Sequence, residues 1–376
     1  MKKWLPGMAL SLAFSMALSA ANAQSRYLLT GTYTGGKSKG IYVYSFDSNT
    51  GKADSVSMVE ASNPSFLAIS PDQKYVFAVH ENGKDGKGGR VSSYSFNKNL
   101  GQLTLINTQS TEGDYPCYVE VDKTGKWVFV ANYGTGNFTS YPVSDSGSLG
   151  EPMVTIKHAG TGADKSRQEG PHVHSTNISP DNKSLYVADL GIDKIMLYDF
   201  NAANGNITPS AAVAAESRPG SGPRHIAFHP TKNLLYLIEE ISGTVVVYEY
   251  QGDKLKELQR LSSVEKNAKG EAGSADIHVS ADGKFLYASN RGDFNNIVIY
   301  KIDAKKGTLK TVGFQPTLGK GPRNFSIDPS GKFLLVANQN TEEVIVFSRN
   351  AKTGLLTKTD NTISVGKPVC LKWMDK

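Results

Sequence analysis

Alternating apolar and polar residues recur along the chain in short stretches. One six-residue version carries an aromatic residue at its fourth position and returns at spacings of 47 to 57 residues. Its seven copies are IYVYSF (41–46), VSSYSF (91–96), FTSYPV (138–143), IMLYDF (195–200), VVVYEY (245–250), IVIYKI (297–302) and VIVFSR (344–349). Period-two alternation with β-branched and aromatic side chains is typical of β-strands. The sequence therefore predicts a regularly repeated strand.

Further strand patterns surround these copies. Two shorter strands usually precede a copy, separated by a turn such as SPDQK (70–74), SPDNK (179–183) or DPSGK (328–332). A second turn, such as NTGK (49–52), follows the copy and leads into one more strand. Pro, Asp, Asn and Gly supply the backbone geometry that such turns need. Each unit is expected to be a four-stranded antiparallel meander, and repetition of such units indicates a β-propeller.

The two ends of the chain complement each other. The N-terminal unit lacks a first strand, whereas PVCLKWM (368–374) is a first strand with nothing after it. If PVCLKWM joins the N-terminal unit, the ring closes without an exposed strand edge. The prediction is an all-β, seven-bladed β-propeller with four antiparallel strands per blade. Two stacked β-sandwiches, the alternative, do not explain why the leftover ends match.

The first residues have the composition of a secretory signal peptide. Lys2 and Lys3 precede an apolar run (8–18), and Ala-Asn-Ala at 21–23 is a small-residue cleavage site. We assign 1–23 to the signal peptide and 24–376 to the propeller, and expect a periplasmic or secreted protein. No stretch is long and apolar enough to suggest a membrane span.

Charge and cysteine content narrow the possible partners. The formal charge is +6, and no basic run with interleaved aromatic residues suggests nucleic-acid binding. Cys117 and Cys370 fall on the first strands of blades that are two apart in the ring. Because a disulfide needs Cα atoms within about 7 Å, we expect two free, buried thiols. We also expect a monomer.

One face of the predicted disc gathers unusual residues. In a propeller the first strands line the central channel, so their starts and the ends of the second strands share a face. At the starts, alignment of the units places Ser65, Cys117, His174, Arg224, Ala275 and Arg323. At or just after the second strands it places Thr32, Tyr33, His80, Glu81, Asn132, Tyr133, Asp189, Leu190, Glu239, Glu240, Asn290, Arg291, Asn338 and Gln339. The charged members come from adjacent blades, and such clustering at a channel mouth predicts an active site.

The residue types limit the chemistry. A His can act as a base near neutral pH, and Arg is shaped to bind a carboxylate, a phosphate or a developing oxyanion. The sequence contains no G-x-S-x-G nucleophile elbow. Hydrolysis of an ester or lactone by a His-activated water fits this set. Formation of a lactone from an unsaturated acid fits it as well.

Several of these residues have structural alternatives. Arg224 and Arg323 each end a Gly-Pro-Arg tripeptide, so either could be a bridge between blades. His172 and His174 share one strand face and could hold a metal ion, but only Asp189 or Glu239 could supply a further ligand. We therefore favour a site without metal or other cofactor. Packing or turn roles are expected for His225, His229 and His278.

Five segments resemble motifs of the seven-bladed β-propeller lactonases, the family of bacterial 6-phosphogluconolactonase. They are GTYTGGKSKGIYVY (31–44), RQEGPHVHS (167–175), GPRHIAFHP (222–230), SNRG (289–292) and GFQPTLGKGPRNFSIDPSGKFLLVANQ (313–339). The family is also similar to a fungal enzyme that cyclises carboxymuconate, and the resemblance matches its His, Glu and two Arg with His174, Glu240, Arg224 and Arg291. Where this chain has Glu239 before Glu240, family members often have Asn.

The resemblance implies a hydrolase of an anionic sugar-acid lactone, and the predicted signal peptide makes it an exported one that acts on another sugar lactone than the phosphorylated cytoplasmic metabolite. His174 would be the base acting through water, Arg224, Arg291 and Arg323 would bind the anionic part and the oxyanion, and Glu240 would orient Arg224 or His174. Further substrate-binding candidates are His172, Glu169 and Glu239. The competing hypotheses are a non-catalytic propeller that binds a sugar acid or a protein partner, and a muconate-type lactonising cyclase.

Overall fold

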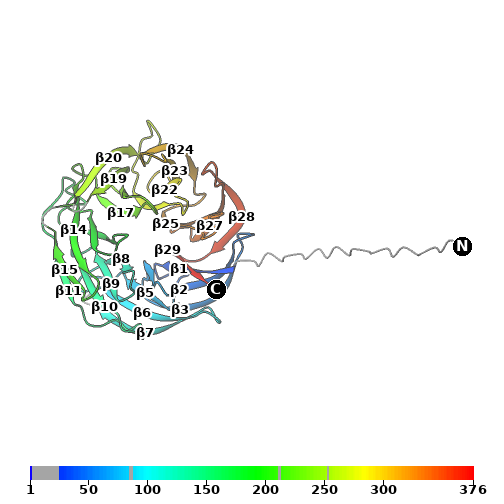
Figure 1. Cartoon of the computed structure of the whole chain (residues 1–376), viewed down its shortest axis with the longest axis horizontal. Coiled ribbons are helices and arrows are strands. Elements are labelled where there is room, and N and C mark those ends of the chain that lie inside the picture. The colour runs from blue at the N-terminus through cyan, green and yellow to red at the C-terminus, as the bar shows by residue number, and fades with distance from the viewer. Residues whose placement is uncertain (2–24, 84–87, 211–212, 252–253) are drawn as a thin grey trace.

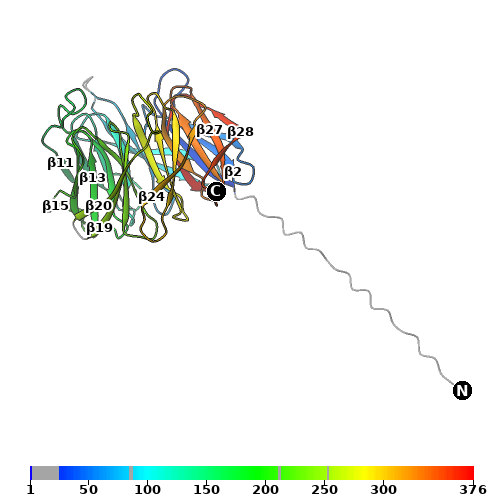
Figure 2. The same ribbon diagram turned by 90° about the horizontal axis from the view of Figure 1, so that it is seen from above.

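The computed structural model describes residue 1 and residues 25–83, 88–210, 213–251 and 254–376. The predicted signal peptide therefore lies outside the described residues, except for Met1. Seven β-sheets surround a central channel, which Figure 1 views end-on and Figure 2 views from the edge of the disc. No α-helix occurs among the described residues, so none there could cross a membrane.

Each blade is a meander whose strands run outward in chain order, except in the blade that closes the ring. From the channel outward, the first four blades are β29 (Pro368–Asp375), β1 (Ser25–Thr32), β2 (Gly40–Asp47) and β3 (Ala53–Glu60); β4 (Leu67–Ile69), β5 (Tyr75–His80), β6 (Arg90–Asn97) and β7 (Gln102–Ser110); β8 (Pro116–Val121), β9 (Trp127–Asn132), β10 (Asn137–Pro142) and β11 (Val154–Lys157); and β12 (Val173–Ile178), β13 (Ser184–Asp189), β14 (Lys194–Asn201) and β15 (Asn206–Pro209), with β16 (Ala215–Glu216) also on β14.

The remaining three blades repeat this arrangement. They are β17 (Pro223–Phe228), β18 (Leu234–Glu239), β19 (Thr244–Gln251) and β20 (Lys254–Ser262); β21 (Ser274–Val279), β22 (Phe285–Asn290), β23 (Asn296–Ile302) and β24 (Leu309–Pro316); and β25 (Pro322–Ile327), β26 (Phe333–Asn338), β27 (Glu343–Arg349) and β28 (Leu356–Ser364). The innermost strands contact one another in the order β29, β4, β8, β12, β17, β21, β25 and back to β29. The predicted seven-bladed fold is confirmed.

The C-terminal strand closes the ring. β29 pairs antiparallel with β1 from Arg26↔Asp375 to Thr32↔Pro368, so the red C-terminal strand lies beside the blue N-terminal one in Figure 1. β1 pairs on its other side with β2. The backbone groups of both chain ends are thereby satisfied within one sheet, and the closure predicted from the leftover strand is confirmed.

The core consists of apolar layers between neighbouring blades. The aromatic residue that marks each six-residue repeat is buried in every blade, from Tyr44 in β2 to Phe347 in β27. Two of the tyrosine hydroxyls donate to a backbone carbonyl across the blade interface, Tyr141 to Ser110 at 2.6 Å and Tyr300 to Ser262 at 2.9 Å. Burial of one such side chain stabilises the fold by roughly 1.5–3 kcal/mol. This repeated packing explains why the hexad recurs.

Candidate active site

Four innermost strands share a β-bulge near their first residues. In β8, β12, β17 and β25 the pairing register skips one residue each, and these are Cys117, His174, Arg224 and Arg323. A bulged residue is left out of the ladder and its side chain is re-aimed. The skipped residues are the ones that alignment placed at the strand starts. The four bulges therefore explain why the predicted residues leave the strand ladder at equivalent places around the channel.

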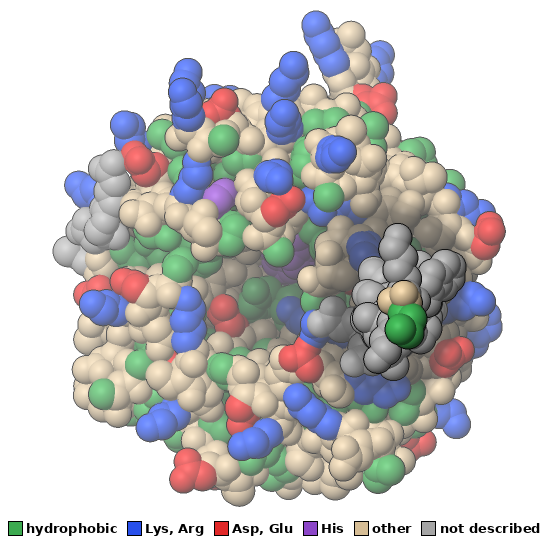
Figure 3. Space-filling model, turned by 45° about the vertical axis from the view of Figure 1, so that its right-hand side comes forward, with side chains coloured by type: hydrophobic (Ala, Val, Ile, Leu, Met, Phe, Trp, Pro, Cys, Tyr) green, Lys and Arg blue, Asp and Glu red, His purple; other side chains and the backbone are tan. Residues whose placement is uncertain are grey.

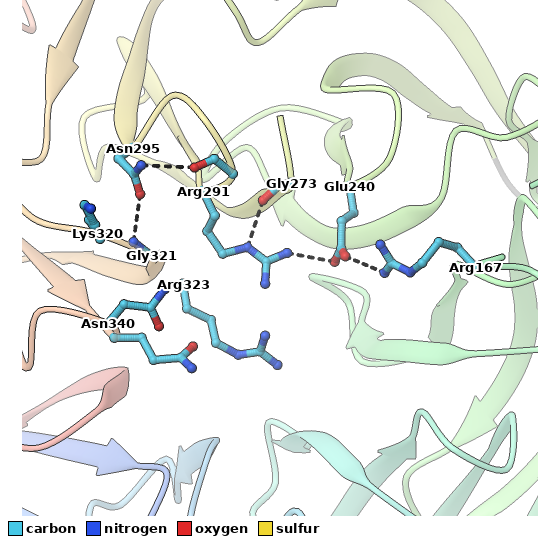
Figure 4. Close-up of a pocket in the computed structure, with 11 residues that line it drawn as sticks. Arg167, Glu240, Gly273, Arg291, Asn295, Lys320, Gly321, Arg323 and Asn340 are labelled. Atoms are coloured by element: carbon cyan, nitrogen blue, oxygen red, sulfur yellow. Dashed lines mark hydrogen bonds and ion pairs between the residues drawn. The ribbon is translucent and has the colours of Figure 1, made fainter. Parts of the chain in front are cut away.

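A pocket of about 460 Å³ opens at this end of the channel. Its lining is polar, its charged residues are four basic ones and one acid, and it includes Arg167, Glu240, Arg291, Asn295, Lys320, Arg323 and Asn340 (Figure 4). In Figure 3 the centre of the disc is hollowed, and Lys or Arg and His side chains gather inside the hollow. The size and charge of the pocket suit a small anionic molecule.

Glu240, the residue after β18, joins three arginines. Its Oε1 accepts a hydrogen bond from Nη2 of Arg167 at 2.7 Å, and its Oε2 accepts one from Nε of Arg224 at 2.7 Å. Nη2 of Arg291 lies 3.1 Å from the same Oε2 (Figure 4). Burial opposes ionisation of Glu240, but Arg291 and Arg224 beside it hold the pKa of its carboxyl well below the usual range. Glu240 is therefore a carboxylate at neutral pH.

The three arginines differ in exposure. Arg224 is fully buried, and its Nη1 donates to the backbone oxygen of Ala275. Arg291 donates from Nε to the backbone oxygen of Gly273 at 2.8 Å, and its side chain is 20% exposed. Arg167 is 41% exposed. Because one carboxylate faces three guanidinium groups, the site keeps a net positive charge.

Arg323 lies with a different set of residues. Its guanidinium carbon is 5.4 Å from the ring centroid of Tyr33, and its Nη2 is 3.9 Å from Oε1 of Glu81. The Tyr33 hydroxyl donates to Oε2 of Glu81 at 2.7 Å. The unit alignment had placed Tyr33 and Glu81 at the mouth, but nothing in the sequence distinguished them from the rest of the ring.

His174 is buried at the bottom of this cluster. Its Nδ1 is 3.8 Å from Sγ of Cys117, and its ring is edge-on to Tyr133 at 5.7 Å and to His225 at 5.2 Å. Within the described residues, no hydrogen bond reaches its Nε2. Burial, with the positive charge of Arg224, lowers the pKa of His174 well below 6.5. A neutral imidazole with a free nitrogen can accept a proton from water.

Both cysteines are free and buried, as predicted. Burial raises the pKa of the Cys117 thiol far above its usual range, and it raises that of Cys370 to about 11. Since the thiolate is the nucleophilic form of cysteine, Cys117 is unreactive at neutral pH despite lying beside His174.

His172 belongs to a neighbouring group. Its ring stacks on Tyr133 at 4.4 Å, its Nδ1–H donates to the backbone oxygen of Tyr133 at 2.9 Å, and its Nε2 is 3.3 Å from Oε1 of Glu169. Asp189, the possible third metal ligand, accepts hydrogen bonds from the His172 backbone and from Nδ1 of His158. In the described parts of the chain, no three His, Cys, Asp or Glu side chains converge as metal ligands.

The structure separates the sequence candidates into three groups. His174, Arg224, Glu240, Arg291 and Arg323 gather at the channel mouth. His172 and Glu169 form a pair next to them. Glu239 lies apart from the cluster: it is fully buried, and its Oε2 accepts from Arg260 at 2.6 Å and from Ser242 at 3.0 Å.

Sequence reasoning missed Arg167 and Lys320 as pocket residues. Arg167 opens the RQEGPHVHS segment, so its signal was present, but its partner Glu240 is 73 residues further along the chain. Lys320 directly precedes the second Gly-Pro-Arg tripeptide, and its counterpart before the first is Ser221, so the repeat gave no sign of a cation at this position.

Comparison with known proteins identifies a matching family and several similar proteins. The family model described as "Lactonase, 7-bladed beta-propeller" matches residues 27–373. A 6-phosphogluconolactonase of Formosa agariphila is 39% identical over 342 residues, covering 90% of this chain and 96% of the relative. One of Bacillus subtilis is 36% identical over 348 residues, covering 92% and 97%. The solved structure of a periplasmic gluconolactonase of Pseudomonas aeruginosa aligns with a TM-score of 0.88 at 37% identity, covering 93% and 99%.

Proposed function

The chain belongs to the family of seven-bladed β-propeller lactonases, and from this premise we propose that it is an exported enzyme that hydrolyses the lactone of a sugar acid. The observation that carries the proposal is the neutral, buried His174, whose Nε2 is free of protein partners among the described residues, beside a cluster of arginines. A hydrolase needs a base and an oxyanion stabiliser in that proximity.

The proposed reaction begins with a water molecule bound at Nε2 of His174. His174 takes a proton from the water, and the oxygen attacks the lactone carbonyl. Arg224 and Arg323, which both act electrostatically on His174, stabilise the negative charge on the carbonyl oxygen. The ring C–O bond then breaks, and the imidazolium returns its proton to the leaving oxygen. The products are a carboxylic acid, which ionises, and a hydroxyl group on the same molecule.

Glu240 acts as a support in this scheme. Both of its oxygens are held by arginines, and its low pKa makes it a poor proton acceptor. We infer that it fixes the guanidinium groups of Arg224 and Arg291 and limits the repulsion between them. We assign this supporting role to Glu240 and not to Glu239, because of the two only Glu240 lines the pocket.

The exposed basic groups favour an anionic or polyhydroxylated substrate. Arg167, Arg291 and Lys320 line the outer part of the pocket. The predicted signal peptide, together with similarity to a periplasmic gluconolactonase, supports a substrate outside the cytoplasm, of the gluconolactone type. His172 stacks on Tyr133, which interacts with Arg167 of the pocket lining, and on this ground we assign His172 and its partner Glu169 to the binding of the substrate's distal hydroxyl groups.

The test is acid release from lactones by purified protein that lacks residues 1–23. We expect turnover of a gluconolactone-type substrate above its spontaneous opening, unchanged by a chelator, and abolished by His174→Ala. His229→Ala, directly after β17 and outside the pocket lining, is the matched control, and it should retain kcat. No turnover across a panel of phosphorylated and unphosphorylated lactones would favour the non-catalytic propeller, and lactone formation from a muconate would favour the cyclase.

A further inference from the structure

A chain of buried hydrogen bonds leads from Arg224 through His225 to Asp276. Nη1 of Arg224 is 3.2 Å from Nε2 of His225, and Nδ1 of His225 is 2.9 Å from Oδ1 of Asp276. We propose that Asp276 and His225 are positioning residues, which fix the guanidinium of Arg224 for the reaction. This inference rests on the proposed lactonase function.

The donors in this chain determine which nitrogen of His225 carries the proton. An arginine Nη group can only donate, so Nε2 of His225 must accept, and the ring proton lies on Nδ1. From there it is donated to Asp276. A doubly protonated ring would place two donors against each other at Arg224. In agreement with this, burial and the charge of Arg224 lower the pKa of His225 to about 4.

Asp276 is well suited to hold this tautomer. It is buried, and its two oxygens accept hydrogen bonds from five donors: Nδ1 of His225 and the Ile277 backbone on Oδ1, and Nε2 of His278, Nδ2 of Asn324 and the Phe325 backbone on Oδ2. The register of β21 shifts between Ser274 and Ile277, so Asp276 lies in a bulge like the residues of the neighbouring strands. The bulge is what directs this carboxylate into the channel network.

Arg224 depends on these partners from two blades. Glu240 holds only its Nε, so Glu240 alone leaves the far end of the guanidinium free to tilt. Nη1 is held by His225 and by the backbone of Ala275. If His225 adopted the other tautomer, its Nε2–H would face an Arg224 donor and push the guanidinium away. A displacement of about 1 Å of a catalytic group can cost on the order of 10²-fold in rate.

His278 provides a control within the same network. It donates to Oδ2 of Asp276 at 2.8 Å, but it does not touch Arg224, and its side chain is 37% exposed. With His225 and Asp276 it lines a second pocket of about 260 Å³, to which Arg224 does not contribute. Substitution of a residue that only supports Asp276 should therefore resemble substitution of His278, whereas substitution of a positioning residue should also disturb Arg224.

The kinetic experiment compares Asp276→Asn, His225→Phe and His278→Gln with the wild type. Asp276→Asn replaces the charged acceptor by a neutral amide and so removes the charge that favours the Nδ1–H tautomer of His225. We expect kcat to fall roughly 10²-fold in the first two variants with KM changed less than threefold. His278→Gln should remain within threefold of the wild type. Equal losses in His278→Gln and Asp276→Asn, or wild-type kcat in folded Asp276→Asn, would overturn the proposal.

A second measurement does not need activity. In protein with ¹⁵N-labelled arginine, the Nη resonances of Arg224, assigned by Arg224→Lys, should show slow rotation in the wild type and in His278→Gln. They should broaden or average in Asp276→Asn and His225→Phe. If no lactone is opened by the wild type but this pattern holds, the proposed function fails and the positioning stands. If the Arg224 signals are the same in all variants, the positioning fails whatever the activity.

Discussion

The floor and the rim of the channel mouth are built in different ways. The floor consists of Cys117, His174, Arg224 and Arg323, which occupy equivalent bulges on innermost strands. The rim consists of Arg167, Arg291 and Lys320, which lie in loops. Both Arg224 and His174 are almost fully buried, whereas Arg167 is half-buried and Lys320 is exposed.

Under the proposed function, this difference separates chemistry from recognition. Arg224 and His174 on the floor are shielded from water, so each interaction there is strong, and proton affinities are shifted. Charges on the rim are partly screened and are suited to attracting and orienting a substrate. Glu240 connects the two regions, since Oε2 holds Arg224 of the floor and Oε1 holds Arg167 of the rim.

The largest effect is expected for Glu240→Gln, which removes this connection. Loss of the carboxylate leaves buried Arg224 without its counter-charge, and breaking a buried ion pair costs about 3–5 kcal/mol. Urea unfolding at pH 7 should show this loss of unfolding free energy, and kcat should fall at least 10²-fold. Glu81→Gln is the control, because its nearest guanidinium is 3.9 Å away and the expected loss is smaller.

The sign of the pH dependence tests the same pair. The folded-state pKa of Glu240 lies well below 4.5, so its ionisation stabilises the fold above pH 4.5, and this contribution disappears as the pH falls through the folded-state value. The difference in unfolding free energy between wild type and Glu240→Gln should therefore shrink in acid. A difference that grows between pH 7 and pH 4 would contradict the assigned ion pair.

The second prediction concerns the base on the floor. Because burial and Arg224 lower the pKa of His174 well below 6.5, the imidazole stays neutral in mildly acidic solution. The acid limb of kcat/KM should therefore lie below pH 6.5, with activity retained at pH 6. Arg224→Gln removes a nearby positive charge and should move this limb to higher pH. An acid limb at or above pH 6.5 in the wild type would exclude His174, in this environment, as the base.

The third prediction tests whether the rim residues bind the charged group of the substrate. Arg291→Ala and Arg167→Ala each remove an exposed or half-buried cation from the pocket. We expect KM for a phosphorylated lactone to rise roughly tenfold, since a hydrogen bond to a charged group contributes about 1.5–3 kcal/mol. KM for the unphosphorylated lactone should change less. Kinetics with both substrates measure the ratio of the two changes in KM. Lys310→Ala, remote from the pocket, is the control. Equal changes in KM for both substrates would show that the rim residues do not recognise the charge of the substrate.

The smallest effect is expected for Cys117→Ala. Burial keeps the thiol protonated, so the mechanism does not use its sulfur, and kcat should stay within about threefold of the wild type. Inactivation by a thiol reagent should also be absent in the native protein. Loss of activity in Cys117→Ala but not in Cys117→Ser would instead show that the group serves as a hydrogen-bond donor to His174.

The sequence predicted the fold and the floor because both follow the repeat. Every blade repeats the same strand alternation, and the aromatic position marks the interface between blades. Once the units are aligned, equivalent positions lie at equivalent places around the channel. His174, Arg224 and Arg323 were therefore predicted together although 149 residues separate the first from the last.

Two rim residues, Arg167 and Lys320, and the supporting network could not be predicted in this way. Arg167 lies in a loop outside the strand repeat, and the residue that aligns with Lys320 in the other Gly-Pro-Arg blade is Ser221, so the alignment marks neither as a pocket cation. His225 and Asp276 are on innermost strands, and the sequence reading of His225 as a packing residue did not include its contact with Arg224. Which of Glu239 and Glu240 faces the pocket depends on where β18 ends and the chain turns.

By itself, the sequence determined a closed ring of seven blades and the residues that meet at one end of its channel. These properties depend on periodicity, which is visible in the order of residues. Tertiary structure alone decided that one carboxylate holds three arginines, that His174 is neutral with Nε2 free of protein partners in the described chain, and that Glu239 is turned toward Arg260. These properties depend on burial and on distances of a few ångströms between residues far apart in the chain, and no local pattern encodes them.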